Sequence, residues 1–203
     1  MSQTSLPVFT IGHSTHPAEV FLELLLSHGI EEVMDVRSSP RSRYNPQFNR
    51  KALQATLADA GVGYVFMGAE LGGRPADPSC YDGESRVQYD RLAGTEAFNA
   101  GIRQVIQRAG ECRIALTCSE KEPLACHRTL LIARVLTARG VAVAHILADG
   151  NLEGHAAAMN RLLDGFSLPR DGDLFRSREQ HIDDAVRRQA RQVAYVGRPP
   201  GRA

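Results

Sequence analysis

Apolar residues recur in two different patterns along the chain. Short continuous apolar runs are typical of strands buried on both faces, whereas apolar residues three or four positions apart, such as Val20, Phe21, Leu24 and Leu25, are typical of helices. This pattern predicts strands at residues 7–12, 32–37, 62–67, 113–118 and 141–147, and helices at residues 17–28, 51–60, 88–108, 129–139 and 151–163.

Because the predicted strands and helices alternate, the pattern favours right-handed βαβ units and an α/β fold with a mostly parallel, five-stranded sheet covered on both faces. We expect this α/β domain to occupy residues 1–168. Beyond Pro169 the composition becomes rich in arginine, so residues 169–203 are expected to form a C-terminal extension, helical over about residues 178–195 and packed on or extending from the core.

Length and composition limit the class of protein. A chain of 203 residues with 43% hydrophobic and 23% charged residues is typical of one folded domain. It has no apolar run near the roughly 18 residues of a membrane-spanning helix, and its start lacks the layout of a signal peptide. We therefore expect a cytoplasmic protein without a membrane partner, whose four cysteines are thiols rather than disulfides.

Polar residues follow several of the predicted strands. Ligands of open parallel sheets bind outside the carboxyl ends of the strands. His13 and Ser14 follow the first strand, Asp35 and Arg37 end the second, and Glu120 follows the fourth. We predict that these side chains surround one pocket that accepts a small anionic, phosphate-containing ligand.

Three of these residues are candidates for catalysis. Asp35 and Glu120 are candidate acid and base groups that flank a scissile bond; the alternative is that each forms a salt bridge to Arg37 or Arg128. His13 is a candidate for orienting a substrate or shuttling a proton, with Ser14 donating a hydrogen bond to an oxyanion. The alternative is that His13 contacts a loop carbonyl and Ser14 caps a helix.

Two further segments are candidates for binding the ligand. Cys126, His127 and Arg128 lie where a loop enters a helix, a place suited to a phosphate or carboxylate, although Arg128 has the alternative role of bracing the loop. The long loop of residues 38–49 carries Arg41, Tyr44 and Asn45, which combine forked donors with an aromatic face, as a nucleotide requires.

The cysteines raise the alternative of a thiol or metal site. Cys118 and Cys126 are eight positions apart beside His127, with His145 as a remote ligand, but this spacing fits no standard zinc pattern. We therefore expect no metal and no cofactor.

Five short motifs, taken together and in this order, resemble the domain-of-unknown-function 488 (DUF488) family over roughly residues 9–146. The motifs are Thr10-Ile11-Gly12-His13-Ser14, Asp35-Val36-Arg37-Ser38 with Pro40-Arg41-Ser42-Arg43, Leu71-Gly72-Gly73, Cys118-Ser119-Glu120 and Cys126-His127-Arg128. The resemblance implies a Rossmann-like, three-layer α/β fold and brings no settled activity with it.

The residues favour a hydrolase or group transferase that acts on a small phosphorylated or nucleotide-like substrate. A noncatalytic nucleotide- or nucleic-acid-binding module, with nucleic acid the less favoured partner, and a thiol- or metal-dependent redox protein are the alternatives. The chain has no P-loop, and no Gly-x-Gly-x-x-Gly follows its first strand, which argues against an NTPase and a dinucleotide oxidoreductase.

Overall fold

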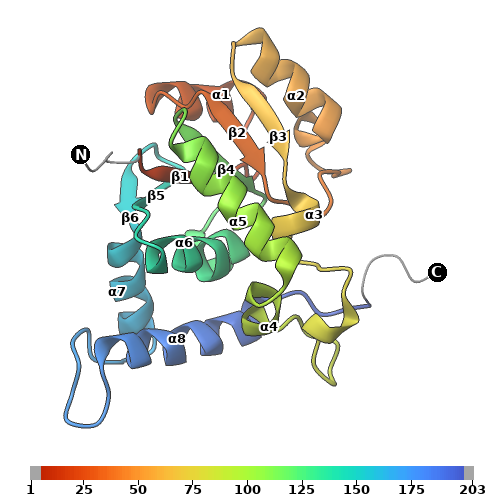
Figure 1. The fold of residues 1–203 in the computed structure, drawn as a ribbon. Coiled ribbons are helices and arrows are strands. Elements are labelled where there is room, and N and C mark those ends of the chain that lie inside the picture. Colours follow the sequence, from red (N-terminus) through yellow and green to blue (C-terminus); the bar gives the residue numbers. More distant parts are fainter. Residues whose placement is uncertain (1–5, 199–203) are drawn as a thin grey trace.

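A computed structural model describes residues 6–198. They form an α/β fold with one mixed β-sheet of six strands at its centre (Figure 1). The strand order is β3-β2-β4-β1-β5-β6; the first five strands are parallel, and β6 pairs antiparallel with β5. The strands are β1 (Val8–Gly12), β2 (Glu32–Asp35), β3 (Gly63–Phe66), β4 (Ile114–Cys118), β5 (Val143–Ile146) and β6 (Leu152–Gly154).

The central strands β1, β2 and β4 are buried along their whole length. Successive side chains of a strand point to opposite faces. Val8 and Ile114 accordingly belong to one hydrophobic core, and their neighbours Phe9 and Ala115 belong to a second core across the sheet. Burial on both faces is the reason β1 and β4 appear in the sequence as largely apolar runs.

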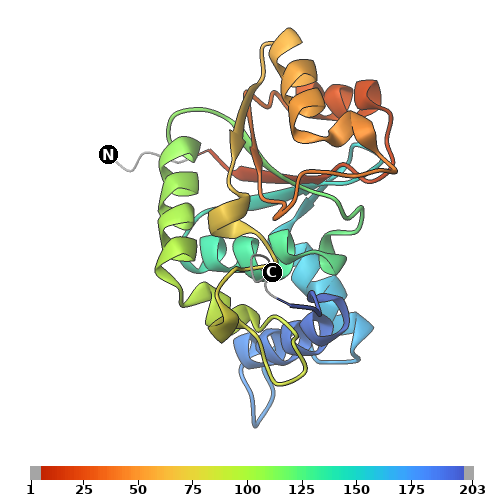
Figure 2. The same cartoon turned by 90° about the vertical axis from the view of Figure 1, so that its right-hand side faces the viewer.

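Helices cover both faces of the sheet (Figure 2). Helices α1 (Ala18–Ser27) and α2 (Arg50–Asp59) supply Phe21 and Leu57 to one core. The other core is covered by α3 (Gly68–Leu71), α4 (Tyr89–Ala93), α5 (Glu96–Ala109), a π-helical turn (Arg128–Ala133), α6 (Arg134–Ala138), α7 (His155–Gly165) and α8 (Arg178–Val193).

The sheet differs from the sequence-based prediction in its number of strands, six rather than five. The additional strand β6 lies at the start of the segment predicted as a helix, which begins only at His155. Leu152 is half exposed, so β6 has no buried apolar run and is defined by its backbone pairing with β5. The predicted helix over residues 88–108 is divided into α4 and α5 at Gly94, and Thr95 caps the second of them.

The crossover connections change direction between β1 and β4, which are neighbours in the sheet. The chain leaves β1 through α1, on one face, to reach β2; it leaves β4 through α6, on the other face, to reach β5. Such a point, where adjacent connections run to opposite sides, opens a crevice at the carboxyl ends of the strands. Gly12 and Cys118 are paired at this crevice.

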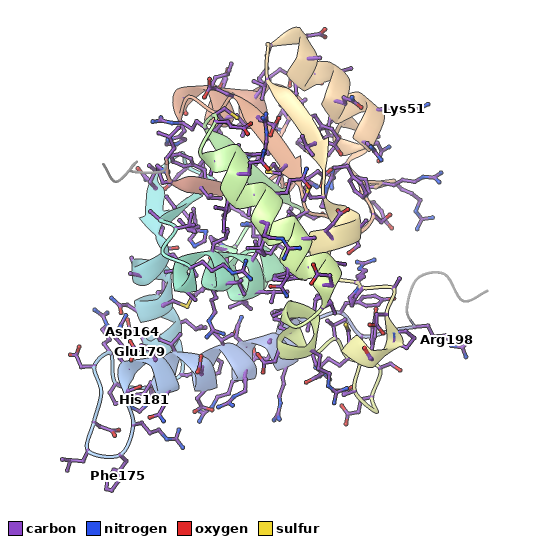
Figure 3. All side chains as sticks on the ribbon, in the orientation of Figure 1. Lys51, Asp164, Phe175, Glu179, His181 and Arg198 are labelled. Carbon is purple, nitrogen blue, oxygen red and sulfur yellow. The ribbon has the colours of Figure 1, made fainter. Side chains whose placement is uncertain are left out.

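The C-terminal helix α8 crosses the end of α7 and adds Ala185 and Val186 to the core (Figure 1). Beyond α8, the Tyr195 carbonyl accepts a hydrogen bond from the Val87 amide. Tyr195 lies near Cys118, at the carboxyl end of β4. Phe175, at the tip of the loop before α8, projects into solvent (Figure 3). Residues 199–203 of the predicted extension lie outside the described residues. No helix within residues 6–198 has the length and apolarity to cross a membrane.

Candidate functional site at the carboxyl ends of the strands

Asp35 and Arg37 form a buried ion pair at the end of β2. Arg37 Nε lies 2.9 Å from Asp35 Oδ1 and Nη2 lies 2.6 Å from Oδ2, and the Tyr64 hydroxyl donates to Oδ2 at 2.8 Å. The Asp35 side chain is fully buried and that of Arg37 is 4% exposed. Because its oxygens already accept four hydrogen bonds, including one from the Arg37 amide, Asp35 is a brace for Arg37 in this geometry.

His13 extends this ion pair across the sheet. Arg37 Nη1 donates to His13 Nε2 at 3.1 Å, while His13 Nδ1 donates to the Ser14 carbonyl at 2.9 Å. The ring stacks on Phe48 with centroids 4.3 Å apart. Burial, together with the charge of Arg37, lowers the pKa of His13 to about 4, so the ring is neutral near pH 7 and accepts from Arg37.

Two thiols, a carboxylate and an imidazole meet where β4 ends. The thiols of Cys118 and Cys126 donate to Glu120 Oε2 at 2.9 and 3.0 Å. His127 Nδ1 lies 3.8 Å from each sulfur. The two cysteines and His127 are buried, and although Glu120 is exposed as a whole residue, its carboxylate is turned towards the sulfurs.

The charges of this cluster shift the pKa values of its members. Burial raises the pKa of Glu120, and ionisation of the neighbouring Cys126 thiol would raise it further. Burial alone would raise the pKa of Cys126, but the hydrogen bond from Cys118 and the charges of Arg128 and His127 place it below its ordinary value. The interaction with the Cys126 sulfur, together with burial, raises the pKa of Cys118.

Arg128 holds the loop between β4 and the π-helical turn. It is fully buried, and its Nη1 donates to the Glu120 carbonyl at 2.7 Å, while Nη2 lies 3.4 Å from the Lys121 carbonyl. The loop lies so close to the end of β1 that a Cβ atom on Gly12 would be 1.8 Å from the Glu120 carbonyl oxygen. Gly12 therefore allows the approach of the loop that carries Glu120.

The change Gly12→Ala is expected to lower the free energy of unfolding by about 1–3 kcal/mol, because the added methyl group collides with backbone atoms that cannot rotate away. Urea denaturation measures this change. Gly154→Ala is the matched control, since a Cβ there meets no atom within 4 Å. Equal stability of the two variants would contradict the close packing of loop and strand.

A pocket of about 410 Å³ opens at this edge of the sheet. Of the residues predicted for the site, it is lined by Arg37, Arg41, Glu120 and His127. Arg74 and Tyr195, which were not among the predicted site residues, also line it. The remaining lining residues are Ser38, Ser39, Ser42, Gly73, Tyr89, Cys118, Ser119, Ala125 and Val193.

Other predicted residues lie behind or beside the pocket. Asp35 and His13 do not line the pocket, but both hydrogen-bond to Arg37, which does. Arg128 hydrogen-bonds to the Glu120 carbonyl, and the Cys126 thiol donates to the Glu120 carboxylate. The other three predicted residues, Ser14, Tyr44 and Asn45, lie outside the pocket lining as well. The Ser14 amide donates to the Ser119 carbonyl, the Asn45 amide donates to Ser42, and Tyr44 is 83% exposed.

Arg74 follows the Leu71-Gly72-Gly73 motif and reaches the pocket because two glycines permit close packing there. A Cβ on Gly72 would lie 2.4 Å from Ser38 Oγ, and one on Gly73 would lie 3.0 Å from the His127 ring. The Arg74 amide donates to Ser38 Oγ, and its guanidinium lies over the Tyr195 ring, 4.6 Å from the centroid. The glycine pair directly before Arg74 was the available sequence signal, whereas nothing local marked Tyr195.

These features define the chain as an α/β protein with a polar pocket at the carboxyl ends of its strands. The family model "Domain of unknown function DUF488" matches residues 17–135, more than half of the chain. The chain therefore belongs to the DUF488 family, which confirms the resemblance seen in its motifs. No curated protein and no solved structure matches it.

Proposed function

We propose that this DUF488 protein is an enzyme, a hydrolase or group transferase, that acts on a small phosphate-containing or nucleotide-like substrate held in the pocket at the strand ends. One observation carries the proposal. The pocket is lined by three arginines, Arg37, Arg41 and Arg74, together with the acid Glu120 and its thiol and imidazole neighbours. Arginines bind an anion and a carboxyl group transfers protons, and an enzyme acting on a phosphorylated substrate requires both kinds of group side by side.

The arginines differ in how much charge they offer a ligand. Asp35 already neutralises Arg37. Arg41 and Arg74 form no ion pair with an acid among residues 6–198. We therefore assign to these two arginines the role of binding the negative charge of the ligand. Guanidinium groups suit phosphate because they donate two parallel hydrogen bonds. The Tyr195 ring beside Arg74 adds an aromatic face for a base.

Glu120 is assigned the role of general acid or base, because its side chain is both a pocket wall and a hydrogen-bond partner of the two thiols. Asp35, His13 and Arg128 are assigned positioning roles: the first two orient Arg37, and Arg128 holds the Glu120 backbone. The position of the pocket at a change in crossover direction supports ligand binding and a Rossmann-like classification of the fold.

The proposal is tested by a binding and turnover panel of inorganic phosphate, nucleoside mono-, di- and triphosphates, sugar phosphates and a short single-stranded oligonucleotide. Binding is measured by calorimetry and products by chromatography. We expect a small phosphorylated compound to bind and to be converted. Binding without conversion would favour the noncatalytic module, tight binding of the oligonucleotide alone would favour a nucleic-acid partner, and no binding at all would reject the pocket.

For the compound that binds, Arg74→Ala is expected to weaken affinity by about 10- to 100-fold, the effect of losing a charge-assisted hydrogen bond of about 1.5–3 kcal/mol. Arg103→Ala is the control, because Arg103 is an exposed arginine of α5 paired with Glu96. The thermal midpoints of both variants are compared with that of the unchanged protein. An equal effect of the two substitutions on affinity would remove Arg74 from the ligand site.

A further inference from the structure

We propose that Cys118, Cys126 and His127 bind a zinc ion at the floor of the pocket. This inference does not rest on the proposed function. It differs from the sequence-based expectation of no metal, which counted two thiols and a remote His145. The fold instead places His127 against both sulfurs, while His145 hydrogen-bonds to Thr10 and His155.

The three donor atoms form a triangle of the size that zinc requires. His127 Nδ1 lies 3.8 Å from each sulfur, and all three donors lie within 4.8 Å of one another. In a tetrahedral site with Zn–S bonds of about 2.3 Å and Zn–N bonds of about 2.0 Å, sulfur and nitrogen are about 3.5 Å apart. A contraction of a few tenths of an ångström, within the reach of side-chain rotations, would therefore complete the coordination.

The surroundings of His127 select the ring nitrogen that faces the sulfurs. Nε2 lies 3.1 Å from the Val36 carbonyl, which only accepts, so Nε2 carries a proton, and Nδ1 is the nitrogen that faces the sulfurs and would supply its lone pair to a metal ion. Zinc-binding histidines characteristically donate their other N–H to a carbonyl or carboxylate in this way. The Arg128 amide, 3.5 Å from Cys126 Sγ, is a donor that supports a thiolate.

The three ligands leave one coordination position for water or for a molecule in the pocket. Cys118 and His127 line the pocket, and so does Glu120, whose Oε2 lies within 3.0 Å of both sulfurs. Three protein ligands with an open fourth position are typical of catalytic rather than structural zinc. Zinc bound here would acidify a water facing the pocket, with the Glu120 carboxylate beside it to accept the proton.

Zinc binding is measured directly, without reference to any activity. The reduced, purified protein is loaded with zinc, desalted and analysed for metal, and its affinity is obtained by competition with a chromophoric chelator. We expect about one zinc per chain. Substitution by Co²⁺ should give the visible absorption of a tetrahedral ion together with thiolate charge transfer.

Cys126→Ser and His127→Gln are expected to weaken zinc affinity by more than about 100-fold. Cys112→Ser is the matched control: Cys112 is a free cysteine just before β4, whereas Cys118 ends that strand. Circular dichroism separates loss of metal from loss of fold. Substoichiometric zinc, or affinity equal in Cys126→Ser and Cys112→Ser, would overturn the site. Because phosphate-ester binding is measured separately with Arg74→Ala, either proposal can fail alone.

Discussion

Replacing Glu120 by glutamine is expected to lower the turnover number by about 10²-fold or more while affinity for the substrate stays within about tenfold. Glutamine keeps the shape and the hydrogen-bonding atoms of the side chain but cannot transfer a proton at neutral pH. The side chain lines the pocket beside Cys118 and contacts both sulfurs, so it lies where a bound substrate would meet it. Steady-state kinetics on the compound identified by the panel would separate the two parameters.

The control for this experiment is Glu96→Gln, which makes the same chemical change at an exposed glutamate in the first turn of α5. Its turnover and affinity should equal those of the unchanged protein. If Glu120→Gln instead weakens affinity and leaves turnover intact, Glu120 contacts the ligand without taking part in proton transfer. The acid or base would then have to be another group of the pocket.

The substitution Asp35→Asn is expected to lower the free energy of unfolding by about 3–5 kcal/mol, because it leaves the charge of the buried Arg37 without a counter-ion. Much of the loss should return in the double variant Asp35→Asn/Arg37→Gln, in which the unpaired charge is removed as well. Urea or guanidinium denaturation, with both single variants and the double variant in one cycle, gives the interaction energy between the two side chains.

A surface pair provides the comparison for this cycle. Asp164 and Arg170 form an ion pair with side chains 47% and 59% exposed, so Asp164→Asn should change stability by less than about 1 kcal/mol. Affinity for the phosphate ester should also fall in Asp35→Asn, since Arg37 lines the pocket and loses the partner that orients it. A cost below about 1 kcal/mol for Asp35→Asn would show that solvent reaches Arg37 once the pair is broken.

The positions of the central strands were predictable from sequence for a physical reason. β1 and β4 are buried on both faces, so residues 8–12 and 114–118 are apolar almost throughout, and a short apolar run of this length is typical of a buried strand. The alternation with helices predicted a mostly parallel sheet. Parallel strands end at the same edge, which is why the sequence alone predicts that His13, Asp35 and Cys118 lie near one another.

The partners of these side chains were not predictable in the same way. From sequence, Asp35 and Glu120 had Arg37 and Arg128 as alternative partners; in the fold Asp35 binds Arg37, and Arg128 binds carbonyl groups of residues 120 and 121. A guanidinium can pair with any acid or carbonyl in reach, and the packing of the loop against Gly12 decides which one is in reach.

The sequence by itself determined the α/β class, the family and the edge of the sheet at which polar residues gather, because these follow from local periodicity and short motifs. The tertiary structure alone decided the sixth strand, the return of Tyr195 to the pocket and the orientation of His127 towards two sulfurs. Each of these depends on a hydrogen bond or contact made across the fold. β6 has no apolar pattern of its own, and His127 is oriented by the carbonyl of Val36, ninety-one positions earlier in the chain.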